Sequence, residues 1–131
     1  MKALLKAIIS LSFIAVIFSF NPLVLAEARK VPETIPEWIY YYADAYNTDY
    51  MELLNVAKCE SGLKVNAVGD SGRAYSVLQF HKSTFEGWEK KLGENLDYYN
   101  FQHQIKLGAW AFSQGEKYKD DWTCWRNLYK S

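Results

Sequence analysis

The stretch KCESG, Lys58 to Gly62, places a cysteine, a glutamate and a serine where a predicted helix meets a glycine. Upstream of it, apolar residues recur at the spacing of one helix face: Tyr50, Leu53, Leu54 and Ala57. Asp49 and Glu52 suit the start of this helix. Gly62 suits its end, because glycine readily adopts the left-handed conformation found there. We therefore predict a helix that carries Glu60 in its last turn.

The position of Glu60 favours proton-transfer chemistry. The C-terminus of a helix carries the negative end of the helix dipole, which disfavours a carboxylate. Burial among aromatic side chains would raise the pKa of Glu60 further, because desolvation penalises the charged form. A glutamic acid that stays protonated near neutral pH can donate its proton to a leaving group. Glu60 is therefore a candidate general acid, and the alternative is an exposed glutamate that merely tolerates a helix end.

Residues 1–26 have the three-part pattern of a secretory signal peptide. Lys2 and Lys6 make the start positive, an apolar run extends from Ala7 to Phe20, and Val24 to Ala26 offers a small-residue cleavage site. A membrane anchor is the alternative, but an Asn-Pro pair interrupts the run short of the roughly 20 residues that a span needs. We expect a secreted or periplasmic, cell-wall-associated protein with no stable membrane anchor after cleavage.

Removing 26 of the 131 residues leaves 105, the size of one small domain. We predict a polar N-terminal tail at residues 27–33 and a folded domain at residues 34–131. Cleavage removes two of the 15 basic residues and none of the 15 acidic ones, so the net charge becomes −2. Without a basic stripe, we expect no nucleic-acid partner. We expect a monomer in which some of the five Trp and ten Tyr build the core.

Both cysteines, Cys59 and Cys124, belong to the predicted mature domain. Two cysteines in an exported chain indicate one disulfide. Such a bridge would join the end of the KCESG helix to the C-terminal segment and hold Glu60 in place. A zinc site is the alternative, but His81 and His103 lack the spacing of metal ligands. We predict no metal or organic cofactor.

The remaining elements are predicted from caps, glycines and periodicity. A capping box at Thr34–Glu37 begins a helix to about residue 46, with Trp38, Tyr41, Tyr42 and Ala45 on one face. A loop is predicted at residues 63–72, and a strand or extended segment at 74–80. Helices are then expected from a capping box at 83–86 to about residue 92, at 99–114, and from Asp120 or Asp121 onward. The pattern predicts a mainly α domain with at most a minor β element.

Several short motifs follow the order and spacing of a known family. They are CESG at 59–62, NAV at 66–68, Gly72, LQF at 78–80, STF at 83–85, QI at 104–105 and WTC at 122–124. Together they resemble the lysozyme-like transglycosylase domain of bacteria, and most closely soluble lytic transglycosylases and resuscitation-promoting factors. The resemblance covers approximately residues 50–126 and implies an α+β lysozyme-like fold.

The resemblance implies that Glu60 cleaves the β-1,4 bond between N-acetylmuramic acid and N-acetylglucosamine in peptidoglycan. The glutamate would protonate the glycosidic oxygen and then act as base, without a second carboxylate. The N-acetyl group of the substrate would stabilise the cation, and its 6-hydroxyl would attack to give a 1,6-anhydro end. Gln79 matches a family glutamine that lines the cleft, and Tyr75 and Ser76 are candidate cleft residues on the same segment.

The sequence departs from the family in three places. Ser76 adds a side chain where the family usually has glycine and backbone approaches the sugar. Gly69 replaces a serine that often contacts substrate, and the adjacent Asp70 and Ser71 are candidates to substitute for it. A Tyr-Asn-Ala-Gly segment found near the end of many lytic transglycosylases is absent.

Asp70 bears on the mechanism because it follows Glu60 by ten residues in a loop that could fold back. A second carboxylate lies about 6.5–9.5 Å from the acid in inverting glycosidases and about 5–5.5 Å in retaining ones. Asp70 could therefore support attack by water, and the alternative is that it caps a glycine turn.

For several other polar and aromatic residues, the sequence allows both a substrate-binding role and a structural role. Asn100 and Gln104 could hydrogen-bond substrate, or Gln104 could be a helix surface residue. Trp88, Trp110 and Trp122 suit the core better than a sugar platform, and His81 suits solvent better than the rim of a cleft.

The sequence thus predicts an exported peptidoglycan-cleaving enzyme, a lytic transglycosylase or lysozyme-type muramidase, with Glu60 as acid and base. A glycan-binding module that kept the fold and lost turnover is the main alternative. A secreted structural or inhibitor-like domain is a third possibility.

Overall fold

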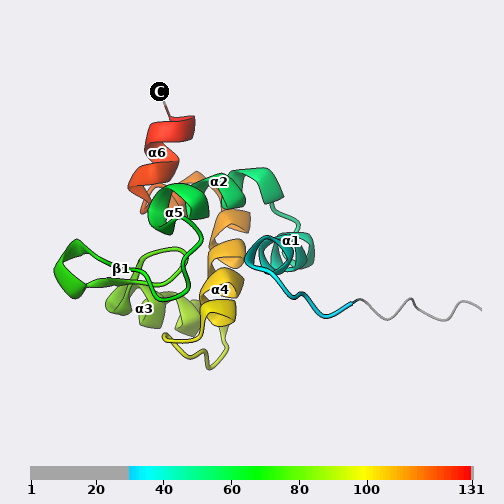
Figure 1. The fold of residues 1–131 in the computed structure, drawn as a ribbon, viewed down its shortest axis with the longest axis horizontal. Coiled ribbons are helices and arrows are strands. Elements are labelled where there is room, and N and C mark those ends of the chain that lie inside the picture. Colours follow the sequence, from blue (N-terminus) through cyan, green and yellow to red (C-terminus); the bar gives the residue numbers. More distant parts are fainter. Residues whose placement is uncertain (1–29, 131) are drawn as a thin grey trace, which may run out of the picture. The chain divides into compact units, whose positions relative to one another are not determined.

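The computed structural model describes residues 30–130, and the predicted signal peptide lies outside them (Figure 1). The elements in chain order are α1 (Ile35–Ala45), α2 (Tyr50–Ser61), β1 (Val68–Gly69), the 3-10 turn η1 (Asp70–Gly72), β2 (Ala74–Tyr75), β3 (Phe80–His81), α3 (Lys82–Leu92), α4 (Phe101–Ser113), α5 (Glu116–Lys119) and α6 (Thr123–Tyr129). The predicted class, mainly helical with a minor β element, is confirmed. None of the described helices is long and apolar enough to cross a membrane.

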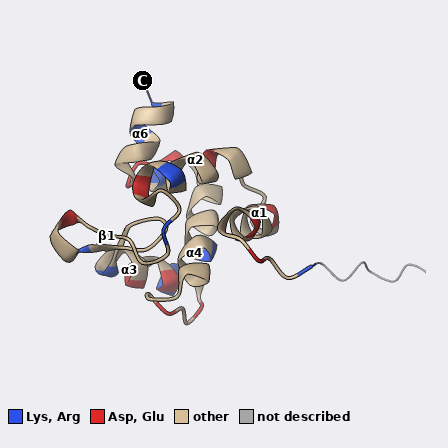
Figure 2. Cartoon of the chain, viewed as in Figure 1, with Lys and Arg blue, Asp and Glu red and all other residues tan. Residues whose placement is uncertain are grey.

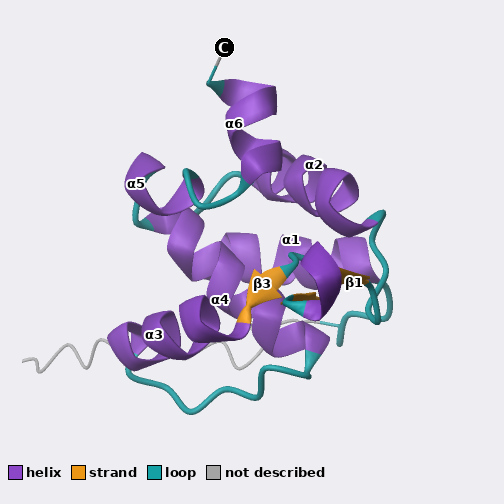
Figure 3. Cartoon of the chain, turned by 90° about the vertical axis from the view of Figure 1, so that its left-hand side faces the viewer, coloured by secondary structure: helices purple, strands orange, loops and turns teal. Residues whose placement is uncertain are grey.

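Helix α4 is the most buried element, and α1, α2, α3 and α5 all contact it (Figure 3). Its buried residues occupy more than half its length: Gln104, Ile105, Leu107, Gly108, Ala109, Ala111 and Phe112. Asn100 caps its start, since the side-chain oxygen accepts from the backbone N–H of Gln102 at 2.9 Å. The helix begins at Phe101, two residues later than predicted. Around this core, acidic and basic residues are interspersed over the helices and loops (Figure 2).

Helix α1 starts at the predicted capping box. The Thr34 side chain accepts from the Glu37 N–H, and the Glu37 carboxylate accepts from the Thr34 N–H at 2.9 Å. The predicted face is correct only in part: Trp38 and Tyr42 pack against the core, but Ala45 is exposed and the fully buried positions are Ile39 and Ala43. Trp38, Tyr41 and Tyr42 are partly buried, whereas Tyr40 is exposed.

Helix α2 has the predicted bounds. The Asp49 carboxylate accepts from the Glu52 N–H at 2.8 Å, and Gly62 ends the helix with a φ of 62°. Leu53, Leu54, Val56 and Ala57 are buried. The local signals were sufficient here because cap, apolar face and terminal glycine agree.

The β element is a three-stranded antiparallel sheet in the order β1-β2-β3. Val68 pairs with Tyr75, and Tyr75 pairs with Phe80. The prediction of one extended segment over 74–80 is wrong, because a tight turn at 76–79 separates β2 from β3. The predicted loop at 63–72 likewise contains β1 and the 3-10 turn.

The turn Ser76–Gln79 enters the core instead of facing solvent. Val77 and Leu78 are fully buried, and both Ser76 and Gln79 have left-handed backbone angles, with φ of 68° and 51°. Leu78 packs against Gly108 of α4, where an added Cβ would lie 2.2 Å from Leu78 Cδ1. The turn therefore requires a glycine in the central helix.

Two further predicted boundaries are wrong. Helix α3 begins at Lys82 after His81, which makes no side-chain cap, so the predicted capping box at 83–86 is not used. The C-terminal region contains two short helices, α5 and α6, and α6 begins at Thr123 instead of Asp120 or Asp121. Helix α3 does end as predicted, at Leu92 before Gly93.

Replacing Gly108 by alanine should lower the free energy of unfolding by about 1–3 kcal/mol, because overpacking must displace Leu78. Urea unfolding monitored by tryptophan fluorescence measures this change. Gly87→Ala is the matched control, since a Cβ at Gly87 of α3 meets no atom within 4 Å. Alanine at that position should leave stability unchanged or raise it by up to about 1 kcal/mol. Equal effects of the two variants would contradict the close approach of Leu78 to α4.

Candidate active site

A cleft of about 610 Å³ opens beside the end of α2. The sheet and the start of α3 form one wall, and the connection between α5 and α6 contributes the other. Three carboxylates line it: Glu60, Asp70 and Asp121. Gln79 and His81 line it from the sheet side, with Trp122 and Thr123 on the side of α6. The cleft thus collects residues from segments far apart in the sequence.

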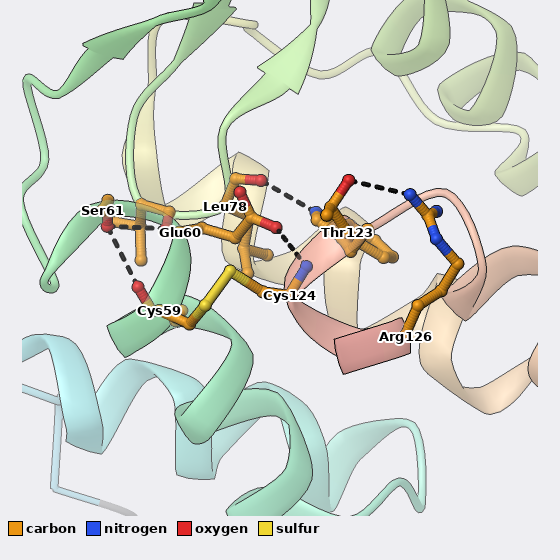
Figure 4. Close-up of a disulfide and its surroundings, with 10 residues drawn as sticks. Cys59, Glu60, Ser61, Leu78, Thr123, Cys124 and Arg126 are labelled. Carbon is orange, nitrogen blue, oxygen red and sulfur yellow. Dashed lines mark hydrogen bonds between the residues drawn. A yellow bond between two sulfur atoms is a disulfide. The ribbon is translucent and has the colours of Figure 1, made fainter. Parts of the chain in front are cut away.

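Glu60 projects from the last turn of α2 towards the start of α6 (Figure 4). Its Oε1 accepts a hydrogen bond from the backbone N–H of Cys124 at 3.3 Å. Burial raises the pKa of Glu60, against the lowering effects of that hydrogen bond and of the Arg126 charge. The predicted direction of the shift is therefore found, with desolvation as its main cause. A partly buried carboxyl group of this kind is suited to hold and release a proton.

The disulfide between Cys59 and Cys124 is present, with the two Cα atoms 5.9 Å apart (Figure 4). It links the residue before Glu60 to the residue whose N–H binds the Glu60 carboxylate. The bridge therefore fixes both sides of this hydrogen bond. Both cysteines are joined in this bridge, so neither thiolate is available as a ligand for the zinc alternative.

Asp70 reaches the cleft, but both of its carboxylate oxygens already have partners. Oδ1 lies 2.8 Å from Arg73 Nη2, and Oδ2 lies 2.9 Å from His81 Nε2. His81 is about half exposed and forms part of the cleft wall, so it is a rim residue and not a merely solvated histidine. These contacts hold Asp70 in a strained turn where its φ is 47°.

Gln79 lines the cleft and also braces the loop before the sheet. Its Nε2 donates to the Ala67 carbonyl at 3.1 Å and to the Ser76 carbonyl at 2.7 Å. Its Oε1 occupies the space beside Gly69, where an added Cβ would lie 2.3 Å away. A serine at this position would collide with the glutamine as it is placed here. This contact gives a physical reason for Gly69.

Two predicted substrate contacts are wrong because the side chains are buried. Ser76 has no exposed surface, since the turn directs it into the core, and so it cannot alter the shape of the cleft. Gln104 is equally buried, and its Nε2 donates to the Tyr98 carbonyl at 2.8 Å. Neither a sugar contact nor a helix-surface role fits Gln104.

Three other candidates lie outside the lining of the cleft. Asn100 uses its side-chain oxygen to cap α4. Tyr75 is partly buried, and its hydroxyl lies 3.4 Å from the side-chain oxygen of Asn66. Ser71 is exposed in the turn that follows Asp70. The structure thus gathers Glu60, Asp70 and Gln79 from the predicted set, and leaves these three apart.

The tryptophans belong mainly to the core, as expected. Trp88 and Trp122 are 7% and 5% exposed. The Trp122 indole N–H donates to the Leu78 carbonyl at 2.8 Å, and its ring packs against Phe80 and Phe112. Trp122 also lines the cleft, so one residue serves both the core and the site. Trp110 is partly buried against Tyr118.

Asp121 and Thr123 line the cleft but were not predicted from the sequence. Both flank Trp122 and precede Cys124, so their proximity to Glu60 follows once the disulfide is accepted. In the part of the chain that the structure describes, the Asp121 carboxylate makes no hydrogen bond or ion pair. The Thr123 Oγ1 accepts from Arg126 Nη2 at 2.8 Å, which leaves the hydroxyl hydrogen able to serve a ligand.

The family model of the transglycosylase SLT domain matches residues 37–129, which span the described fold from α1 to α6. The chain belongs to this family. The resemblance inferred from its motifs is thereby confirmed, and the fold of the SLT domain is of the lysozyme-like α+β type. No curated protein and no solved structure gives a significant match.

The raised pKa of Glu60 makes a pH-dependent contribution to the stability of this SLT domain. The folded state keeps the proton at pH values where the unfolded chain has lost it, so burial of Glu60 costs stability as pH rises from the unfolded pKa to the folded pKa. Glu60→Gln removes that cost and keeps an oxygen to accept from Cys124. We therefore expect the stability of the variant minus that of the wild type to be larger at about pH 7 than at about pH 4. Urea unfolding of both proteins at each pH gives their free energies of unfolding. If the difference between variant and wild type is the same at both pH values, burial does not raise the pKa of Glu60.

The disulfide should stabilise the domain by about 4 kcal/mol through restriction of the unfolded chain. Cys59→Ala/Cys124→Ala should therefore unfold at much lower urea concentrations than the oxidised wild type. A reducing agent should shift the wild type to the same extent and leave the double variant unaffected. Identical unfolding of wild type with and without reductant would show that the bridge does not stabilise the fold.

Proposed function

We propose that this protein is an extracytoplasmic enzyme that cleaves peptidoglycan glycan strands at the β-1,4 bond after N-acetylmuramic acid. The observation that carries the proposal is a partly buried glutamate of raised pKa in the cleft of an SLT domain. Peptidoglycan lies outside the cytoplasm, which agrees with the signal peptide predicted from residues 1–26.

In the proposed mechanism Glu60 serves first as acid and then as base. It donates its proton to the glycosidic oxygen while the bond from that oxygen to C1 of the muramic acid breaks. The N-acetyl group of the same sugar stabilises the positive charge at C1. The 6-hydroxyl then attacks C1 and returns a proton to Glu60, which closes a 1,6-anhydro ring. The glutamate ends protonated, so one carboxyl group completes the cycle.

The contacts of Asp70 support a mechanism without a second catalytic base. Both oxygens of the Asp70 carboxylate are engaged, one by Arg73 at 2.8 Å and the other by His81 at 2.9 Å, so neither is placed to receive a proton from an attacking water. We assign Asp70 to shaping the cleft wall. Asp121 has no such partners among residues 30–130 and is the carboxylate available to contact sugar hydroxyl groups.

The binding-module alternative loses one of its reasons. Ser76 motivated it, since an extra side chain in the cleft could impair turnover, and Ser76 is fully buried. The remaining departure, the missing Tyr-Asn-Ala-Gly segment, concerns one wall of the cleft.

The test is digestion of purified peptidoglycan by the oxidised mature protein, followed by mass spectrometry of the soluble products. We expect anhydro-muropeptides from the wild type and a loss of at least about 100-fold in rate for Glu60→Gln, the scale of general acid–base catalysis. Glu116→Gln, an exposed carboxylate of α5, is the matched control and should retain full activity.

Other products would revise the proposal in defined ways. Reducing muropeptides would show that water attacks, and Asp121→Asn would then be the next variant to assay. Peptidoglycan binding by wild type and Glu60→Gln alike, with no soluble product from either, would establish the binding module. Absence of both binding and cleavage would exclude peptidoglycan as the ligand.

A further inference from the structure

A second hollow of about 300 Å³ adjoins the catalytic cleft. His81 lines both hollows, and the Asp70–Arg73 ion pair joins their walls, since Asp70 lines the cleft and Arg73 lines the second hollow. Lys82, Ser83, Tyr98 and Tyr99 complete most of its lining. We call this feature the basic hollow.

The two neighbouring hollows differ in charge. Three carboxylates line the cleft, whereas none of the described residues that line the basic hollow is acidic. Arg73 uses Nη2 for the Asp70 carboxylate and Nε for the Asp70 carbonyl, so its Nη1 makes no hydrogen bond within the described chain. Among the described residues, Lys82 forms one ion pair, a long one with Nζ 3.9 Å from Glu86 Oε1. Both cations are exposed and able to receive an anion.

The basic hollow also has an aromatic side. Tyr99 is 64% exposed, and its ring packs edge-on against Tyr75 and Tyr98. Tyr98 is held in turn by its hydroxyl, which donates to the Phe80 carbonyl at 2.7 Å. Lys82 Nζ lies 6.0 Å from the centre of the Tyr99 ring. An exposed aromatic ring beside cations suits a ligand that carries both apolar groups and carboxylates.

We infer that the basic hollow binds the peptide stem of the glycan strand whose glycosidic bond lies at Glu60. This inference rests on the proposed function. In peptidoglycan the peptide is attached to the muramic acid through its lactyl group, and it carries free carboxylates and apolar side chains. Because His81 lines both hollows, a peptide attached to a sugar in the cleft would reach the basic hollow by crossing this side chain. Lys82 and Arg73 would pair with its carboxylates, and Tyr99 would contact its apolar atoms.

The test compares two substrates that share the same glycan. One is intact peptidoglycan, and the other is the strand after an amidase has removed its peptides. We expect the wild type to cleave the stem-bearing strand faster. Lys82→Gln should reduce this preference by about three- to tenfold, the range expected for one partly exposed charge-assisted contact. Tyr99→Ala should reduce it similarly, and added salt should weaken the effect of Lys82.

Lys90→Gln is the matched control, since Lys90 is an exposed lysine of the same helix and does not line either hollow. It should keep the wild-type preference. Equal rates on both substrates for the wild type, with no change in Lys82→Gln, would overturn the inference and leave the proposed function intact.

Binding of a soluble stem peptide, followed by NMR chemical shifts, gives a readout that does not need turnover. Wild type should bind it with shifts at Tyr99 and Lys82, and Lys82→Gln should bind several-fold more weakly. If neither strand is cleaved but the peptide binds in this way, the proposed function fails and the basic hollow stands. No peptide binding, or a response only to a phosphate-bearing wall polymer, would show that the ligand is assigned wrongly.

Discussion

The turn Ser76–Gln79 is the junction on which the rest of the structure depends. Leu78 packs into the space that Gly108 leaves in α4, so the turn and the central helix fit only together. The two buried carbonyls of the turn then bind the elements that carry the site. Ser61 Oγ at the end of α2 donates to the Val77 carbonyl at 2.7 Å, and the Trp122 indole N–H donates to the Leu78 carbonyl at 2.8 Å. Because buried carbonyls need partners, these bonds place the end of α2 and the start of α6 on either side of one turn.

That placement explains how a small domain holds a carboxyl group of raised pKa. The disulfide and the turn bring the backbone N–H of Cys124 to the Glu60 carboxylate at 3.3 Å. This donor and the Arg126 charge favour the ionised form, whereas burial opposes it and is the larger effect. The two turns near Glu60 contain residues with left-handed backbone angles: Asp70, Ser71, Ser76 and Gln79. Residues in such conformations cost about 1–3 kcal/mol each, and such strain tends to occur at functional sites.

The elements predicted correctly are those whose signals are local. The end of α2 at Gly62 and the start of α1 at Thr34 depend on side chains within four residues, so the sequence specifies them directly. The errors share a different origin. Ser76 and Gln104 are polar and were expected at the surface, but both are buried. Ser76 lies in the turn that enters the core, and Gln104 donates a hydrogen bond to the Tyr98 carbonyl. The strand predicted over 74–80 is a hairpin, because burial of Leu78 against α4 favours a turn over continued extension.

By itself the sequence determined the helical class of the domain, the order of its motifs, the pairing of its two cysteines and the identity of Glu60 as the candidate acid. Each depends on residue type and spacing along the chain. Only the tertiary structure decided which residues share the cleft: that Asp121 and Thr123 face it, that both oxygens of Asp70 are bound, and that a basic hollow lies beyond His81. These residues lie on segments separated by up to 63 positions, from Glu60 to Thr123. Their proximity arises from long-range packing and the disulfide, which no local pattern encodes.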